Sequence, residues 1–378
     1  MSNHRQISLG EITVSQALEW DVFDGNGNLL LRKGFVIQSL SQAESLIARG
    51  MFVDKSTSES RQDSAHVKSE PLSVLGSISQ VVMKLAIILR DMRELPNAND
   101  KVIDLCKMLL NAISMNEDLA LASILLNQSS GTYSVRHSVD TAILAILVAK
   151  TMGKSEQEIL DITAAAFTMN ISMIGVQEKL QSKKDPLTPE ETALIHRHPL
   201  TAIETLFEAG IENSEWLMYI LMHHEHEDGT GYPVGTLKSE IPQNAKILSL
   251  ADGFCARITS RGYKKSTLPS QALRDIFIEN TAHTDPTLGA YFVKVLSLYP
   301  PGTFVRLKNQ EVAVIAHRGL GPKACVAFSL VNNNNEVISN PIKRDTSIEP
   351  FTIKEALHPI QASVYFSLKQ VWGQQASL

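Results

Sequence analysis

Histidine side chains are concentrated in one short part of the sequence. The chain contains 11 histidines, and five of them lie within 31 residues: His196, His198, His223, His224 and His226. The last three follow the apolar run 217–222 and open a glycine-rich loop that ends at Pro233. Imidazoles at a helix end can face one cavity and bind a transition metal. Two histidines that cap a helix before an ordinary turn fit the pattern equally well.

Helical periodicity dominates the middle of the chain, from about residue 72 to 298. Apolar residues recur at helical spacing in 102–113, 135–151, 159–167, 189–209 and 216–224. One helix is predicted to begin after Thr188, because Thr188 can act as N-cap, Pro189 suits the first turn and two acidic residues follow. Long helices do not alternate with short buried strands, which disfavours a doubly wound α/β fold.

The two ends of the chain show a β pattern. A turn cluster at 24–28 separates the runs 20–23 and 29–31, which predicts a hairpin, and 39–48 is predicted to be helical. Short strands are predicted at 303–307, 311–316, 324–331 and 336–339. The predicted fold is mainly α. Its parts are a small N-terminal α+β module (1–55), a polar linker (56–75), a helical domain (76–298), a β-rich appendage (299–350) and a partly helical tail (351–378).

The composition predicts a cytoplasmic chain without a nucleic-acid or membrane partner. Lys and Arg number 35 against 40 Asp and Glu, a net charge of −5, whereas nucleic-acid binding usually needs a basic face. The longest apolar run, 141–149, is shorter than the roughly 20 residues of a membrane-spanning helix. The first residues lack the apolar stretch of a signal peptide. Cys106, Cys255 and Cys325 are odd in number and far apart, which favours a reducing compartment.

The segment from His223 to Pro233, HHEHEDGTGYP, resembles the hallmark of HD-GYP domains, which is HHE, two variable residues and DG-x-GYP. Neighbouring motifs agree: His137 opens an apolar helix, His198 precedes a proline, and KILSLAD ends at Asp252. The resemblance covers roughly residues 130–300, and the segment after YPPG resembles an extension found on such proteins. It implies an HD-type helical bundle that holds two or three metal ions and hydrolyses cyclic di-GMP, a bacterial second messenger.

The resemblance also implies a set of metal ligands, of which one part is missing here. The positions that match are His137, His198, His223, His224 and Asp252. The His-Asp pair that gives the domain half its name falls on Met169 and Asn170, and the lysine that follows falls on Met173. The site is therefore a degenerate version of the family's site.

These three replacements weaken a two-metal hydrolase. Two ions about 3.5–4 Å apart clamp the attacking and leaving oxygens, and a bridging carboxylate offsets their repulsion, but Asn170 offers only a neutral carbonyl oxygen. Met169 is a soft thioether, unsuited to the Fe or Mn that the family uses, and Met173 removes a cation that would bind phosphate. Because the site must lower a barrier by at least about 8 kcal/mol, we expect no catalysis by the family's mechanism.

Other parts of the site remain available for binding. His198, His223 and His224 can form a three-histidine site of the kind found in some zinc enzymes. Two states of this site are compatible with the sequence. In one, the histidines bind one divalent metal (Fe, Mn or Zn); in the other, no metal is bound and the histidines are hydrogen-bonded. With the family match, a ligand pocket is predicted at Arg261, Tyr263, Lys264 and Lys265, which supply cations for phosphate and a ring for guanine. A solvated basic loop is the alternative.

The sequence therefore predicts a bacterial cyclic di-GMP signalling protein with a degenerate HD-GYP domain. It is expected to be non-hydrolytic and to bind the nucleotide, partner proteins or both. The partner surface is expected on the loop residues Asp228, Gly229, Gly231, Tyr232 and Pro233. The alternatives are an active metal-dependent cyclic di-GMP phosphodiesterase, or an HD-class enzyme that acts on another phosphate ester through one metal. The sequence names no input signal and no oligomeric state.

Overall fold

Contacts in the computed structural model divide the chain into two units, residues 1–70 and 71–378, and each unit is described by itself. The described residues are 4–6, 18, 21–23, 29–35, 52–54, 73–126, 131–183, 185–237, 240–259, 267–279, 285–321, 324–362 and 366–377. The predicted helix at 39–48 and nearly all of the predicted linker lie outside these residues.

The N-terminal unit contains a four-stranded sheet with the order β1-β4-β2-β3. Its strands are β1 (His4–Gln6), β2 (Val22–Phe23), β3 (Leu29–Leu31) and β4 (Phe52–Asp54). The predicted hairpin is confirmed, because β2 and β3 pair antiparallel with Val22 opposite Leu31.

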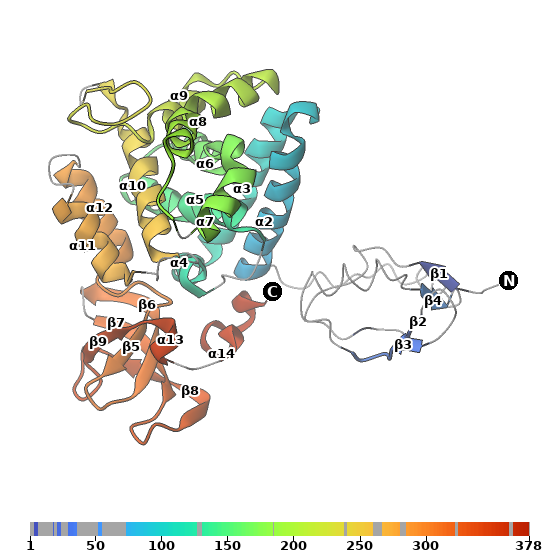
Figure 1. Cartoon of the computed structure of the whole chain (residues 1–378). Helices are drawn as coiled ribbons and strands as arrows, with labels where there is room; N and C mark the ends of the chain where they lie inside the picture. The colour runs from blue at the N-terminus through green and yellow to red at the C-terminus, as the bar shows by residue number, and fades with distance from the viewer. Residues whose placement is uncertain are drawn as a thin grey trace. The chain divides into compact units, whose positions relative to one another are not determined.

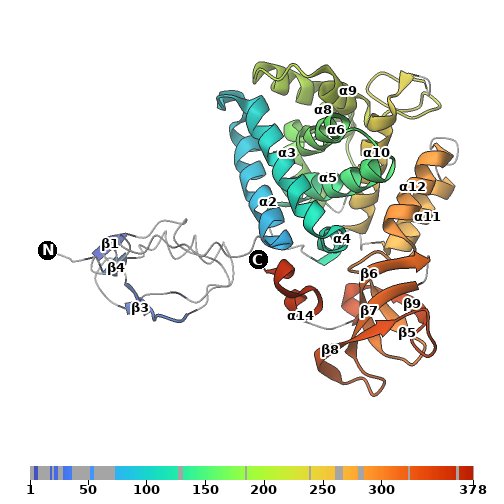
Figure 2. The same ribbon diagram turned by 180° about the vertical axis from the view of Figure 1, so that it is seen from behind.

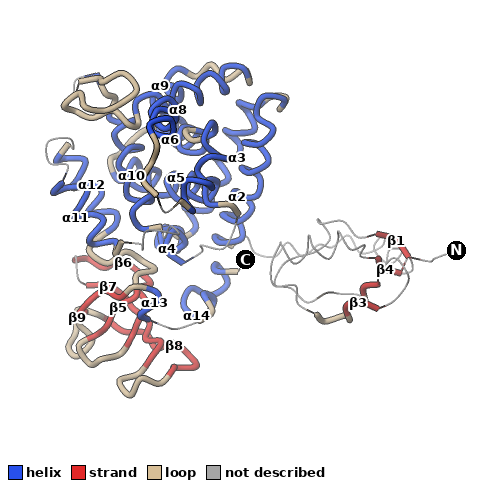
Figure 3. Tube along the Cα trace, in the orientation of Figure 1, coloured by secondary structure: helices blue, strands red, loops and turns tan. Residues whose placement is uncertain are grey.

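The second unit begins with a bundle of helices (Figures 1 and 3). In chain order they are α2 (Val74–Asp91), η4 (Met92–Glu94), α3 (Ala98–Met115), α4 (Glu117–Leu126), α5 (Tyr133–Thr151), α6 (Glu156–Thr168), η5 (Ile171–Met173), α7 (Ile174–Ser182), α8 (Pro189–Glu208), α9 (Ser214–Met222), α10 (Gln243–Ile258), α11 (Pro269–Glu279) and α12 (Pro286–Leu296). The five predicted helices all form. The predicted start at Thr188 is a capping box, in which Thr188 and Glu191 each bind the other's backbone N–H.

Helix α5 is the centre of the bundle. Its residues from His137 to Ala149 are buried on every face, and it packs against α6 and α10 (Figure 2). A helix that is apolar all round can only be stable in a core. Asp140, which also lies on this stretch, has a pKa raised far above the usual range by burial, against an opposing effect of Arg136.

Among the described residues, one continuous helical run is long and apolar enough to cross a membrane, Glu156–Gln177, and 78% of an apolar 18-residue stretch within it is buried inside the unit. The pair Ala98–Met115 and Glu117–Leu126 passes the same test only as one span bent by 107°. Burial in the bundle accounts for the apolar side chains of Glu156–Gln177.

A five-stranded antiparallel sheet with the order β8-β7-β6-β5-β9 follows the bundle. Its strands are β5 (Phe304–Leu307), β6 (Val312–Gly321), β7 (Ala324–Val331), β8 (Val337–Asp345) and β9 (Ile353–Leu357). The four predicted strands form, and β9 carries the sheet beyond residue 350. The short helices α13 (Pro359–Ala362), α14 (Leu368–Trp372) and η7 (Gly373–Ala376) complete the unit. The mainly α fold with an N-terminal module and a β appendage is confirmed.

The sheet and the bundle share one hydrophobic core and meet very closely at Gly302. A Cβ built on Gly302 would lie 3.0 Å from the carbonyl oxygen of Ala122 and 3.2 Å from Cβ of Leu125, both on α4. Gly302 also has a φ of +91°, a conformation that residues with a side chain rarely adopt.

Replacing Gly302 with alanine should therefore destabilise the protein more than backbone strain alone. Gly210→Ala is the matched control, because Gly210 has a φ of +78° but nothing within 4 Å of a built Cβ. We expect about 1–3 kcal/mol of strain in both variants, with an additional loss only in Gly302→Ala. Urea denaturation followed by circular dichroism measures the difference, and equal losses would contradict the close contact.

Candidate functional site

Three histidines from two neighbouring helices lie together in the bundle. His198 is on α8, His223 is the residue that ends α9, and His224 follows it. One ring nitrogen from each lies within 4.8 Å of the others. Helix α8 begins at the capping box and α9 begins at Asn213, whose side chain accepts the N–H of Trp216. Local capping therefore fixes where both helices start.

The rings of His198 and His223 are oriented by backbone carbonyl groups. Nδ1 of His198 lies 2.5 Å from the oxygen of Ile195, and Nδ1 of His223 lies 2.6 Å from the oxygen of Ile220. A carbonyl only accepts, so both Nδ1 atoms carry the proton. The two Nε2 atoms face one another at 3.3 Å.

These facing nitrogens are both lone-pair donors at neutral pH. Burial lowers the pKa of His198 to about 4, with a contribution from the charge of His223, and burial lowers the pKa of His223 as well. Two neutral imidazoles whose Nδ1 protons are committed cannot hydrogen-bond to one another through Nε2, because both nitrogens are acceptors. Two nitrogen donors oriented in this way, with His224 beside them, suit one transition metal ion, because metal-binding histidines use their second nitrogen for such a carbonyl contact. The residues therefore fit a single metal.

His137 and Asp252 form a pair beside this cluster. His137 Nε2 lies 2.7 Å from Asp252 Oδ1, joining α5 to α10, and Tyr133 stacks on the His137 ring. Burial by itself would raise the pKa of Asp252, but the hydrogen bond from His137 and the neighbouring histidines hold it well below the usual range. Nδ1 of His137 is buried and has no hydrogen-bond partner within the described part of the chain. Asp252 is therefore an anion beside the histidine cluster.

The loop after His224 is held in place by the carboxylate of Glu225. Its two oxygens accept the backbone N–H groups of Val234, Gly235 and Thr236 at 2.7, 3.2 and 2.8 Å. Glu225 is 5% exposed. A buried carboxylate that accepts several N–H groups fixes the backbone around it.

Gly231 lets the loop fold back on itself. A Cβ there would overlap the backbone of His224, Glu225 and His226, so the close approach requires glycine. The next residue, Tyr232, donates its N–H to the oxygen of His224 at 3.1 Å. Its ring stacks on His224 and on His196, with centroids 4.7 and 4.3 Å apart. The loop therefore covers the histidine cluster with an aromatic ring.

A cavity of about 340 Å³ opens beside the cluster, and we call it the front pocket. Its lining includes His137, His198, His224, Tyr232 and Asp252, together with Asn170, Met173 and the apolar side chains Leu180, Leu187 and Ile195. Its described lining residues include no lysine or arginine. Met169 belongs to the hydrophobic core and is completely buried.

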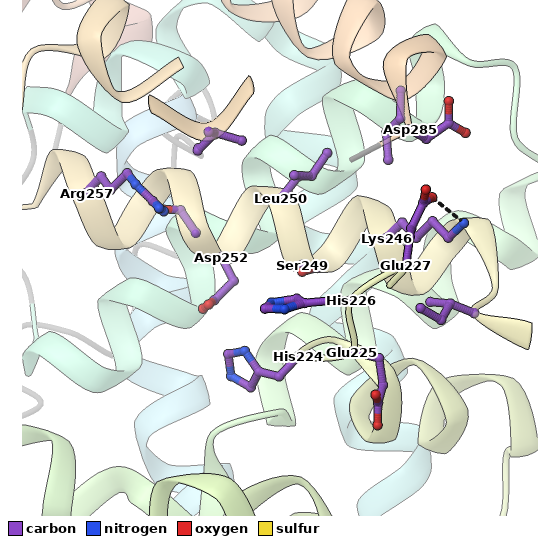
Figure 4. A pocket seen from close by; sticks show the side chains of 14 residues that line it. His224, Glu225, His226, Glu227, Lys246, Ser249, Leu250, Asp252, Arg257 and Asp285 are labelled. Carbon is purple, nitrogen blue, oxygen red and sulfur yellow. Dashed lines mark hydrogen bonds and ion pairs between the residues drawn. The ribbon is translucent and has the colours of Figure 1, made fainter. Parts of the chain in front are cut away.

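A second cavity, of about 360 Å³, lies on the other side of His224 and Asp252, and we call it the back pocket. Figure 4 shows it along α10, where Lys246 and Arg257 are at opposite ends and His226 lies between Glu227 and Asp252. Lys246 pairs with Glu227 at 2.7 Å. His224 and Asp252 line both cavities, so they form a wall between them.

Several other sequence predictions can be placed. His196, one of the five clustered histidines, is exposed and lies outside the three-histidine group. The three cysteines are buried without disulfides, and burial raises the pKa of Cys255. The predicted ligand residues lie outside the described residues: Arg261, Tyr263, Lys264 and Lys265.

The residues that support the cluster were not predicted from the sequence. Glu225 stands in the HHE motif without a predicted role, and the stacking of Tyr232 on the histidines was not predicted. A carboxylate directly after two histidines and before a glycine-rich loop was the available signal, because such a loop exposes backbone N–H groups that need acceptors. The back pocket had no sequence signal, since its lining comes from distant segments.

Comparisons with known proteins agree with this architecture. Residues 105–288 match the family described as HD domain. A cyclic di-GMP phosphodiesterase of Pseudomonas aeruginosa is 29% identical over 224 residues, which cover 58% of this chain and 54% of that protein. The cyclic di-GMP phosphodiesterase PdeB of Borreliella burgdorferi is 27% identical over 186 residues, 49% of each chain. The chain thus spans about half the length of these relatives.

A third relative and one solved structure complete the comparison. The cyclic di-GMP phosphodiesterase response regulator RpfG of Xanthomonas campestris pv. campestris is 33% identical over 146 residues, 38% of each chain. The solved structure of an HDG"Y"P protein from Bdellovibrio bacteriovorus superposes with a TM-score of 0.55 at 17% identity, covering 78% of this chain and 99% of that one. This structural likeness shows the fold.

Removing the charge of Glu225 should loosen the loop that carries Tyr232. In Glu225→Gln, an NH2 group can replace the carboxylate oxygen that accepts the N–H of Thr236, so two donors would then face each other. We expect a loss of about 1.5–3 kcal/mol in unfolding free energy. Faster hydrogen exchange at residues 234–236 should accompany it. The exposed Glu240→Gln is the control and should change stability by less than about 0.5 kcal/mol. Unchanged exchange at 234–236 in Glu225→Gln would refute the role of Glu225.

Proposed function

We propose that this chain, whose residues 105–288 match the family described as HD domain, is a cyclic di-GMP signalling protein of the HD-GYP kind that does not hydrolyse the nucleotide by the family's mechanism. It acts by binding the nucleotide, partner proteins or both, in the cytoplasm. The relatives that match are cyclic di-GMP phosphodiesterases by name, and this likeness supports the nucleotide. The departures in the site support the loss of hydrolysis.

One observation carries the proposal: Asn170 and Met173 line the front pocket beside His198 and His224. A bridging carboxylate and a cation would stand at these two positions in the resembling family. Here the wall offers a neutral amide and a thioether, and neither compensates two metal charges nor binds a phosphate. Met169 lies in the core, where it packs as an apolar side chain.

The three-histidine cluster supports a single divalent metal rather than two. His198, His223 and His224 would hold it, and a bound ion would supply a Lewis acid or a structural charge. The chain's own contribution is orientation: the carbonyls of Ile195 and Ile220 aim two of the rings, and Tyr232 covers the third. The carboxylate of Asp252 adds negative charge beside the cluster.

The loop 228–237 is the proposed partner surface. Its outward part includes Val234 and Leu237, which are 67% and 58% exposed. Glu225 holds the backbone beneath them, so a partner would meet a preformed surface and pay little ordering entropy. Tyr232 itself faces the histidines, so the contact with a partner would come from its neighbours.

The second candidate function is an active metal-dependent phosphodiesterase. The observation that favours it is the same cluster, because three histidines with an open position are the ligand set of some catalytic zinc centres. This function would need one metal to replace two.

Metal content tests the cluster directly. Protein purified without a histidine tag should contain close to one divalent ion per chain by mass spectrometry, and His223→Ala should lose it. His226→Ala is the control, because His226 lies outside the three-histidine group and should leave the content unchanged. A wild-type content no higher than that of His223→Ala would contradict a metal at this site.

A paired assay separates the two functions. Calorimetry with cyclic di-GMP should detect binding, while turnover with Mn, Fe or Mg should stay at the level of a metal-free control. Linear product above that control would reject the non-hydrolytic function, and the absence of both binding and turnover would reject the nucleotide. Combined Met169→His, Asn170→Asp and Met173→Lys substitutions should restore hydrolysis if these residues alone disable the site.

A further inference from the structure

A separate cavity of about 310 Å³ lies where the helical bundle meets the C-terminal sheet. We call it the junction pocket. It is lined from six segments, among them α4, α5, α10 and the strands β5 and β9, and its lining includes Leu125, Arg136, Ile258, Thr303, Phe304 and His358. None of these residues belongs to the histidine cluster. Small-molecule sites are typically cavities of this size at the interfaces between structural units.

The walls of the junction pocket are mostly apolar. Leu125 and Ile258 contribute from the bundle, Phe304 and Leu357 contribute from the sheet, and Leu268 contributes from the segment before α11. Such a surface favours a ligand with a hydrocarbon body, because burying apolar area is the main source of affinity for small ligands.

Thr303 carries a hydroxyl group that the protein leaves without a hydrogen bond. Its side chain is 4% exposed, and Oγ1 has no hydrogen-bond partner among the residues that the structure describes. The backbone of Thr303 is satisfied, because its N–H binds the oxygen of Pro300 and its oxygen accepts the N–H of Ile315. Buried hydroxyls nearly always have a partner. Oγ1 is itself sealed from solvent, so a ligand atom in the pocket would complete this group once the Thr303 side chain turns towards it.

The charge of the junction pocket selects the kind of ligand. Arg136 is the one lysine or arginine among its described lining residues, which include no aspartate or glutamate. His358 and Thr267 add further polar groups from two other segments. A guanidinium group is well suited to a carboxylate, which it can bind through two N–H groups.

We propose that the junction pocket is a binding site for a small carboxylate with an apolar body. The carboxylate binds Arg136 and the hydroxyl of Thr303, and the hydrocarbon part fills the space between Leu268 and Phe304. Arg136 directly precedes His137 on α5, and Ile258 lies on α10 with Asp252. The pocket is thus built on the same two helices that are joined by the His137–Asp252 pair.

Calorimetry of the full chain with octanoate tests the proposal, with 1-octanol and inorganic phosphate as separate probes of the two halves. Octanoate should bind at least about tenfold more tightly than either, which is the scale of one charge-assisted hydrogen bond. Absence of octanoate binding, or equal affinity for octanol, would overturn the proposal.

Three substitutions place the binding in this pocket. Arg136→Gln should weaken octanoate about tenfold or more, and Leu268→Trp should abolish binding by filling the cavity. Thr303→Val should weaken binding about twofold to tenfold without lowering the melting temperature, because the hydroxyl has no partner to lose. If Arg136→Gln fails to fold, the other two variants decide.

Arg306→Gln is the matched control, since Arg306 lies on β5 and pairs with Glu355 but does not line the pocket. It should leave octanoate affinity unchanged. Affinity that is unchanged in Leu268→Trp and Thr303→Val would locate octanoate elsewhere and overturn the proposal. The outcome is independent of whether the histidine cluster binds metal or cyclic di-GMP.

Discussion

The facing Nε2 atoms of His198 and His223 impose the constraint on which the site depends. Both rings donate their Nδ1–H to a backbone carbonyl, and burial keeps both rings neutral. Two lone pairs at 3.3 Å repel unless a positive charge lies between them. The surrounding structure maintains this arrangement through helix caps at one end and the Glu225 loop at the other. A bound cation would remove the repulsion between the two lone pairs, and three imidazole nitrogens bind a transition metal ion well.

The part of the front pocket that contains Asn170 and Met173 differs chemically from the part that contains the histidines. Asn170 and Met173 offer no charge, and apolar side chains from α7 and α8 extend that surface. The three-histidine part of the site is therefore complete, whereas the part that would balance the charge of a second metal is not. A binding protein needs only the first half, whereas an enzyme of the two-metal type needs both.

Much of the fold followed from local sequence patterns. Thr188 and Glu191 predicted a helix start because a capping box is made within four residues, and the strands after residue 302 followed from their short alternating runs. The grouping of His198, His223 and His224 rested on resemblance to a family, because spacing alone left it open. The wall between the two pockets, the stacking of Tyr232 on His196 and the unsatisfied hydroxyl of Thr303 depend on contacts between distant segments, which no local pattern encodes.

The wall formed by His224 and Asp252 makes the front and back pockets thermodynamically linked. A molecule that moves either side chain from one side changes the shape and charge of the other side. Any resulting coupling free energy must be the same in both directions, so an occupant of the back pocket would alter affinity at the front by the factor that it experiences itself. Two side chains shared by both cavities thus give this fold a direct route by which one binding event can affect another.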